Sequence, residues 1–143
     1  MASEGGFLNY SSIQLTIRDL KKLGWDYDIC ERFMHNKFVN RSGHRKDLFN
    51  IFDLIAMDDH SVIGIQTCKN DFASHYRKIT IDHQEKAQKW LRRHCRIQIW
   101  NWSLRIKPGC RKKRTWQPRI VSITHRDFEA HRCDVVGTAI TGA

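Results

Sequence analysis

Asp53 is the residue from which a chemical function of this chain can first be argued. It is the only charged residue in the apolar stretch Ile51-Phe52-Asp53-Leu54-Ile55. A carboxylate in such a setting is costly to remove from water unless a hydrogen-bond donor or a cation compensates its charge. Asp53 is therefore either a structural acid, held by backbone N–H groups or by Arg45, or part of a binding site.

A polar cluster follows the next apolar run of the chain. Residues 62–65 lead into Gln66, Thr67, Cys68 and Lys69, and the polar turn 58–61 separates them from the run 48–57. Two short apolar runs joined by a polar turn predict an antiparallel hairpin in which Asp53 faces the end of the second strand. Because carboxylate and amide oxygens bind divalent cations, this arrangement is typical of metal-dependent nucleases.

The composition favours a polyanionic partner. The 143 residues include 25 Lys and Arg against 15 Asp and Glu, which gives a formal charge of +10. Nucleic acid is the simplest partner for such a chain, although basic residues can also serve solubility alone. The length predicts a single domain over residues 12–128, between a flexible N-terminus at 1–11 and a tail at 129–143.

The cysteines and the hydropathy exclude several classes of protein. The five cysteines are an odd number, widely spaced and without a CxxC pair, which favours reduced thiols over a disulfide framework. No apolar segment approaches the roughly 20 residues needed to cross a bilayer, and no signal peptide is recognisable. We expect a cytoplasmic protein with no membrane partner. A zinc site is not indicated, because the spacings between the candidate ligands match no common zinc-binding motif. The candidates are His75, His83, His94, Cys68 and Cys95.

Ahead of the hairpin the sequence predicts a helix, a strand and a loop. Ser11 or Ser12 caps the helix, which Gly24 ends. A strand is expected over residues 25–34, with Glu31 inside it. The polar and basic residues 35–46 are expected to form a loop.

After the hairpin, a crossover helix returns the chain to the sheet. Asn70 or Asp71 caps a helix that begins at Phe72, and Asp82 caps its second part after a break at residues 80–82. Strictly alternating residues predict strands over 96–102 and 115–124, which enclose the basic turn 107–114. This order predicts an α/β sandwich, a mixed sheet flanked by helices.

The element order and four segments resemble one enzyme superfamily. The segments are residues 45–56, residues 65–68, residues 73–79 and residues 96–102. Together they resemble the PD-(D/E)XK nucleases, and more narrowly the Holliday-junction-resolvase-like proteins of phages and bacteria. The likeness covers residues 12–125. It implies a restriction-endonuclease-like core in the order α-β-β-β-α-β-β, endonuclease activity on DNA with Mg²⁺ or Mn²⁺ as cofactor, and in many relatives a homodimer.

The resemblance also implies roles for individual residues. Asp53 takes the place of the motif Asp, Gln66 the place of the Glu and Cys68 the place of the Lys. Gln66 carries no charge and Cys68 cannot act as an ammonium group, so Lys69 or Lys78 would have to supply the cation. Further metal ligands would come from the Thr67 carbonyl and from the side chains Glu31, Gln14 and Asp47.

Two groups of basic residues could hold phosphates along a nucleic acid. The first precedes the hairpin and consists of Arg41, Arg45 and Lys46. The second fills the last turn and consists of Lys107, Arg111, Lys112, Lys113 and Arg114. The last hairpin also contains three tryptophans, Trp100, Trp102 and Trp116. They either pack in the core and against the neighbouring strand, or one of them stacks on a base or sugar. An inactive nuclease-like module that binds structured DNA or RNA through the same groups is the alternative function.

Overall fold

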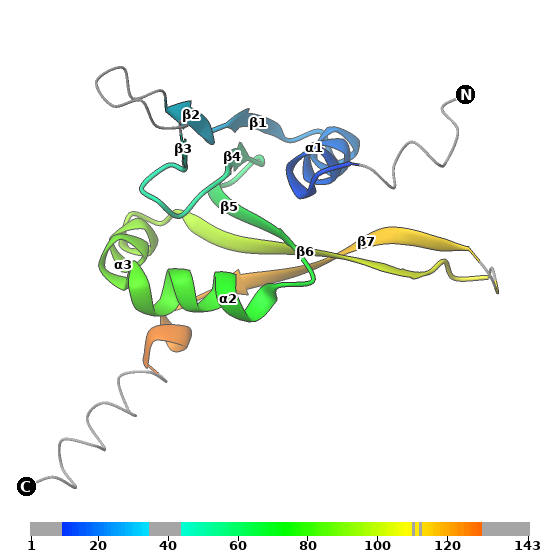
Figure 1. Ribbon diagram of the computed structural model, residues 1–143. Coiled ribbons are helices and arrows are strands. Elements are labelled where there is room, and N and C mark those ends of the chain that lie inside the picture. The colour runs from blue at the N-terminus through cyan, green and yellow to red at the C-terminus, as the bar shows by residue number, and fades with distance from the viewer. Residues whose placement is uncertain (1–9, 35–43, 110, 112, 130–143) are drawn as a thin grey trace, which may run out of the picture.

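A five-stranded mixed sheet forms the centre of the computed structural model, which describes residues 10–34, 44–109, 111 and 113–129 (Figure 1). The strand order across the sheet is β1-β4-β5-β6-β7. The strands are β1 (Asp26–Ile29), β4 (Leu54–Met57), β5 (Val62–Lys69), β6 (Arg96–Ile106) and β7 (Arg114–Ile123). Helices cover both faces, so the predicted α/β class and mixed sheet are confirmed.

The pairing of the strands brings particular chain ends together. β4 and β5 form the predicted antiparallel hairpin around the turn 58–61, and β6 and β7 form the second one. β5 and β6 are parallel, and α2 (Phe72–Arg77), the π-helical segment η2 (Lys78–Asp82) and α3 (Gln84–Arg92) connect them. One end of the sheet therefore holds the end of β5 and the beginning of β4. The part of β6 that pairs with β5 ends there as well.

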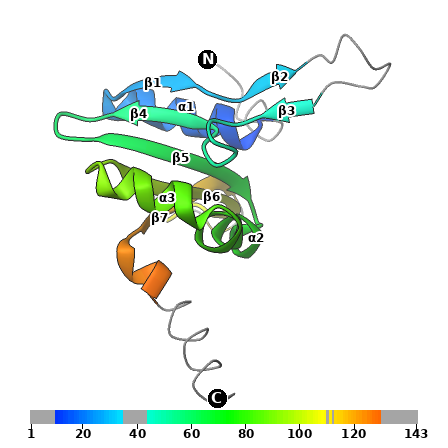
Figure 2. The same ribbon diagram turned by 90° about the vertical axis from the view of Figure 1, so that its left-hand side faces the viewer.

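Helix α1 (Ser12–Leu23) covers one face of the sheet (Figure 2). It begins with a capping box in which the Ser11 side chain accepts from the Gln14 N–H, and it ends at Gly24 with φ 73°. Glycine adopts this left-handed conformation without steric cost. Leu15 and Leu20 of α1 are fully buried against side chains of the sheet, which are Leu54, Ala56, Ile63, Ile65, Trp100 and Trp102.

The crossover helices cover the opposite face. Ile79 of η2 and Ala87 of α3 pack against Phe52, Ile97 and Ile99 in a second buried cluster. The predicted helix break at residues 80–82 is a π-helical turn, in which the Thr80 hydroxyl donates to the carbonyl of Tyr76 at 2.8 Å. The predicted capping by Asp82 is wrong, because the π-helical turn includes Asp82 and α3 begins after His83. Asp71 is the N-cap of α2, but its side chain makes no capping hydrogen bond.

The expected single strand over residues 25–34 is divided into β1 and β2 (Arg32–Met34). The N–H groups of Cys30 and Glu31 both donate to the Asp53 carbonyl, at 2.8 and 3.2 Å. The pairing of β1 with β4 ends at this point. β2 then pairs with β3 (His44–Lys46) in a separate two-stranded sheet. The expected loop over residues 35–46 is therefore wrong at its end, because β3 is a strand; residues 35–43 lie outside the described residues.

The apolar run 48–57 is a strand only from Leu54 onward. Phe49 and Asn50 have positive φ angles of 55° and 60°, and the Leu48 N–H donates to the Phe52 carbonyl at 3.0 Å. Residues 47–52 thus form a tight turn that buries Ile51 and Phe52 on the crossover-helix face. The correction matters for the site, because Asp53 lies at the junction between this turn and β4.

No helix among the described residues is long and apolar enough to cross a membrane.

We predict that Gly64→Ala destabilises the fold. A Cβ atom on Gly64 would lie 2.6 Å from the ring of Phe52, which is fully buried and cannot move away freely. Overpacking of this kind lowers the free energy of unfolding by about 1–3 kcal/mol, which urea denaturation would measure. Adding Phe52→Leu should restore part of the loss, and equal stability of Gly64→Ala and wild type would contradict the packing described.

Candidate functional site

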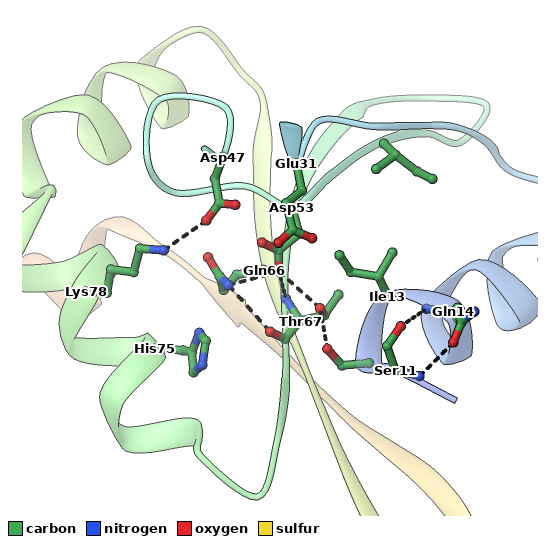
Figure 3. Close-up of a pocket in the computed structure, with 12 residues that line it drawn as sticks. Ser11, Ile13, Gln14, Glu31, Asp47, Asp53, Gln66, Thr67, His75 and Lys78 are labelled. Carbon is green, nitrogen blue, oxygen red and sulfur yellow. Dashed lines mark hydrogen bonds and ion pairs between the residues drawn. The ribbon is translucent and has the colours of Figure 1, made fainter. Parts of the chain in front are cut away.

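A pocket of about 710 Å³ opens at the end of the sheet where β5 ends and β4 begins (Figure 3). The beginning of α1, the β1–β2 junction, the turn before β4, the end of β5 and the crossover helices all contribute to it. Its lining contains most of the predicted site residues, which are Gln14, Glu31, Asp47, Asp53, Gln66, Thr67 and Lys78. It also contains Ser11, Ser12, Ile13, Ile29 and His75.

Asp53 is fixed in place by both its backbone and its side chain. Its N–H donates to the Ile65 carbonyl at 2.9 Å. One carboxylate oxygen, Oδ2, accepts from the Thr67 N–H at 2.9 Å, from the Thr67 hydroxyl at 3.0 Å and from Gln66 Nε2 at 3.0 Å. Only 7% of the residue is exposed. The predicted contact of Asp53 with the end of the neighbouring strand is thus confirmed.

Burial and a second acid disfavour the charged form of Asp53. Loss of hydration is the largest cause and raises the pKa of its carboxyl to about 7, against the hydrogen bonds from Thr67, which lower it. The negative charge of Asp47 and a hydrogen bond between the two carboxyl groups raise the pKa further. A proton or a cation bound at Asp53 would therefore relieve the cost of its buried charge.

The side-chain oxygen of Gln66 has no partner in the described part of the chain. Gln66 is 2% exposed, and its Nε2 group points toward Asp53 and, at 3.4 Å, toward the Thr67 carbonyl. This leaves Oε1 buried without a hydrogen bond. A buried acceptor without a partner is costly, and a bound cation or a donor on a ligand would remove that cost.

Lys78 lies on the side of the pocket opposite α1. Its Nζ atom is 3.0 Å from Asp47 Oδ2, so Asp47 is placed between Lys78 and Asp53 (Figure 3). His75 lies one helical turn earlier, and burial lowers the pKa of its imidazole, which favours the neutral form. His75 Nδ1 is buried and has no hydrogen-bond partner among the residues described.

Two of the predicted catalytic residues are not in the pocket. Cys68 is buried in the cluster beneath the crossover helices, where its thiol donates to Asn101 at 3.5 Å and burial raises its pKa to about 11. Lys69 extends to the opposite face, because successive side chains of a strand alternate. Its ammonium group donates to the Tyr10 carbonyl and lies 4.3 Å from the ring centroid of Trp116. Neither side chain therefore lies among the residues that line this pocket.

Sequence reasoning placed Gln14 of the first helix at the site, but it missed the contribution of Ser12 and did not place His75 beside Lys78. The Ser12 hydroxyl is 2.9 Å from the Thr67 hydroxyl, so the first turn of α1 joins the same network that holds Asp53. This contact depends on how α1 packs, and no local pattern indicates it. The position of His75 had a signal, because it precedes Lys78 by three residues in a predicted helix and such residues share a face.

A metal ion at this site would rely on few carboxylates. Among the residues that the structure describes, no group of three or more His, Cys, Asp and Glu side chains is placed to hold a metal ion. The donors present are instead the Asp53–Asp47 acid pair and the unpartnered Gln66 Oε1. Mg²⁺ is commonly held by one or two carboxylates and keeps several waters, so this donor set fits it. Glu31 lines the same pocket.

The predicted nucleic-acid-binding residues are described in part. Lys107, Arg111 and Arg114 are exposed at the tip of the β6–β7 hairpin, and Lys113 is half-buried there. Lys46 is exposed at the end of β3, while for Arg45 only the backbone in β3 is described. Arg41 and Lys112 lie outside the described residues. Core packing is confirmed for Trp100 and Trp102, which are buried, whereas Trp116 is half-buried.

No protein-family model matches this chain, and no curated protein or solved structure matches it either.

We predict that Asp53 makes stability depend on pH in the neutral range. Its pKa in the folded protein is about 7, above its ordinary value of 3.8, so the folded state binds the proton more tightly. The free energy of unfolding should therefore fall as pH rises from about 4 to about 7, by up to about 4 kcal/mol.

Asp53→Asn supplies the comparison, because asparagine can keep the acceptor oxygen but does not titrate. Urea unfolding of both proteins across this range, without divalent cations, should give a stability difference that grows in favour of the variant as pH rises. A difference that stays constant with pH would contradict the raised pKa.

Proposed function

We propose that this protein is a divalent-metal-dependent endonuclease that hydrolyses phosphodiester bonds in DNA, with Asp53 at the centre of its site. The observation that carries the proposal is the acid pair Asp53–Asp47 next to the unpartnered Gln66 Oε1, in an open pocket. A basic chain with such a pocket is suited to bringing a phosphate and a cation together.

The topology supports the same proposal. A helix, an antiparallel β1–β4–β5 unit, a helical crossover and a parallel β6 follow one another, as the resemblance to the PD-(D/E)XK nucleases implies. Asp53 precedes the middle strand of the unit and Gln66 lies near the end of the next one. A restriction-endonuclease-like core with a changed motif accounts for both positions.

Mg²⁺ or Mn²⁺ would be held by Asp53, Asp47 and Gln66 Oε1. Thr67, with its carbonyl, and Glu31 line the same pocket. Such an ion, when bound, polarises a phosphate and lowers the pKa of a water molecule. The hydrogen bonds from Thr67 and Gln66 all go to one oxygen of Asp53, Oδ2, and fix the orientation of its carboxyl group.

The missing motif lysine has a replacement on the crossover helices. Lys78 reaches the pocket from η2, where it pairs with Asp47 at 3.0 Å. An ammonium group at this position can stabilise negative charge that develops on a phosphate if the phosphate displaces Asp47. His75, kept neutral by burial, lies at the same side and can accept a proton. Cys68 and Lys69 take no part.

A catalytically inactive module that binds DNA or RNA is the second candidate. Two observations favour it. The described residues contain no three-ligand cluster, and Lys78, which supplies the only ammonium group among the described residues that line the pocket, is paired with Asp47. The two candidates differ in metal binding, which can be measured apart from cleavage.

We predict that Asp53→Asn abolishes metal binding and nicking together. Mg²⁺ or Mn²⁺ at millimolar concentration should raise the melting temperature of the wild type, because the cation binds only the folded acid pair. The variant should show no rise and no nicking of supercoiled plasmid. Asp59→Asn, an exposed acid in the β4–β5 turn, is the matched control and should behave as wild type. A wild-type protein that neither binds the cation nor nicks would favour the inactive module.

We further predict that Gln66→Glu strengthens the site. A second carboxylate in place of the unpartnered amide oxygen should lower the Kd for Mn²⁺ by about tenfold, as measured by calorimetry, since charge count governs affinity for hard cations. Without the cation the same change should lower stability, because it adds a buried acid next to Asp53. Gln88→Glu on α3 is the control. An unchanged Kd for Gln66→Glu would mean that the cation does not contact this side chain.

A further inference from the structure

The β6–β7 hairpin extends beyond the sheet as a two-stranded arm (Figure 1). The last pair that joins β6 to β5 is Lys69 with Trp102. From Ser103 to Ile106, β6 has β7 as its only neighbour, with pairs that run from Ser103 and Gln117 to Ile106 and Arg114. At about 3.3 Å per residue this free part is roughly 13 Å long before the turn.

The arm is basic and leaves the sheet at the same end as the pocket. The sequence contains no Asp or Glu between Lys86 and Arg126. Arg105, Lys107, Arg111 and Arg114 are all exposed on the arm or at its tip. Because β5 and β6 are parallel, the arm starts where β5 ends, beside Lys69 and two residues beyond Thr67 of the pocket.

Internal contacts give the arm a defined shape. The Gln117 side chain reaches across the ribbon to the carbonyls of Arg105 and Ile106, at 3.4 Å each. The Lys107 N–H closes the tip by donating to the Lys113 carbonyl at 2.8 Å. A ribbon held in this way can enter a groove with little further loss of conformational entropy.

We propose that the arm inserts into the major groove of B-form duplex DNA while the pocket holds a phosphodiester of the same duplex. The second part of this proposal, that the pocket holds a phosphodiester, rests on the proposed function. The major groove of B-DNA is about 12 Å wide and about 8.5 Å deep, and it admits a two-stranded ribbon of this length. The major groove of A-form RNA is too narrow for side chains to enter, so duplex RNA is a poor substrate.

The arrangement of side chains fits this ligand. The exposed cations at the tip and edges meet phosphates on both sides of the groove. Leu104 and Ile106 are 37% and 56% exposed and share one face of the arm, where thymine methyl groups offer apolar contacts. A second copy of the chain is disfavoured as the partner, because it would bring two basic arms together and Pro118 interrupts the free edge of β7.

The first test measures binding of the full chain in EDTA, so that cleavage does not intervene. The probe is a short fluorescent DNA duplex, and the variant is Lys107→Glu, Arg111→Glu, Arg114→Glu combined. We expect the variant to lose at least about tenfold in affinity. The slope of log K against log salt concentration should become shallower by about 3, since each lost phosphate contact reduces that slope by close to 1. The matched control, Lys86→Glu, Lys89→Glu, Arg93→Glu on and after α3, carries the same charge change away from the arm. Equal losses in the two triple variants would overturn the proposal.

The second test asks where the arm lies. Wild-type protein should protect guanine N7 atoms in the major groove from dimethyl sulfate, and the arm variant should not. An RNA duplex of the same sequence should bind at least about tenfold more weakly than the DNA. Unprotected N7 atoms, or equal affinity for the two duplexes, would overturn groove insertion.

The third test addresses self-association. If Ile106→Asp converts a dimer to a monomer in sedimentation and leaves DNA binding unchanged, the arm is a protein interface and the proposal fails. Failure of the arm and failure of the nuclease are distinguishable. The difference in duplex binding in EDTA between the arm variant and its matched control reports on the arm, whereas the melting temperature with and without Mn²⁺ reports on the pocket.

Discussion

The hydrogen bonds of Asp53 join three segments of the chain at one point. Its N–H binds the Ile65 carbonyl of β5, its carbonyl accepts from Cys30 and Glu31 after β1, and its carboxylate accepts from Thr67 and Gln66. The end of β1, the beginning of β4 and the end of β5 are therefore fixed relative to one another by a single residue. The division of β1 from β2 and the opening of the pocket both follow from this junction.

The same junction concentrates unfavourable electrostatics. Burial raises the pKa of Asp53, Asp47 adds a like charge, and Gln66 Oε1 is left without a partner. Each feature destabilises the folded chain on its own, and a protein without a ligand for this pocket would gain stability by replacing them with apolar residues. The cation that we propose for this pocket would offset all three effects at once.

Parallel pairing of β5 and β6 places the pocket and the arm on one end of the sheet. Strands that run in the same direction bring their ends to the same side, and the crossover through α2, η2 and α3 makes this direction possible. Lys78 enters the pocket because η2 lies on this crossover. The basic residues at the tip of the arm lie away from the rest of the sheet, because β6 and β7 extend past the end of β5. Binding and chemistry would thus act on neighbouring parts of one polymer.

The sequence by itself determined the features that depend on neighbouring residues. The capped helix α1, the β4–β5 hairpin around residues 58–61 and the alternating strands β6 and β7 were all predicted, because caps, polar turns and side-chain period act over a few residues. The sequence also indicated that Asp53 has hydrogen-bond partners, since a buried acid among apolar residues requires them in any fold.

Only the tertiary structure decided which groups reach Asp53. Lys69 shares its face of β5 with Thr67 but lies two residues farther along, at Trp116, and the packing of the crossover helices buries Cys68, so neither approaches the acid. The tight turn at Phe49 and Asn50 brings Asp47 back to Asp53, and Lys78 approaches from a helix many residues later. These contacts depend on how whole elements pack, and packing is set by the sum of long-range burial rather than by any local pattern.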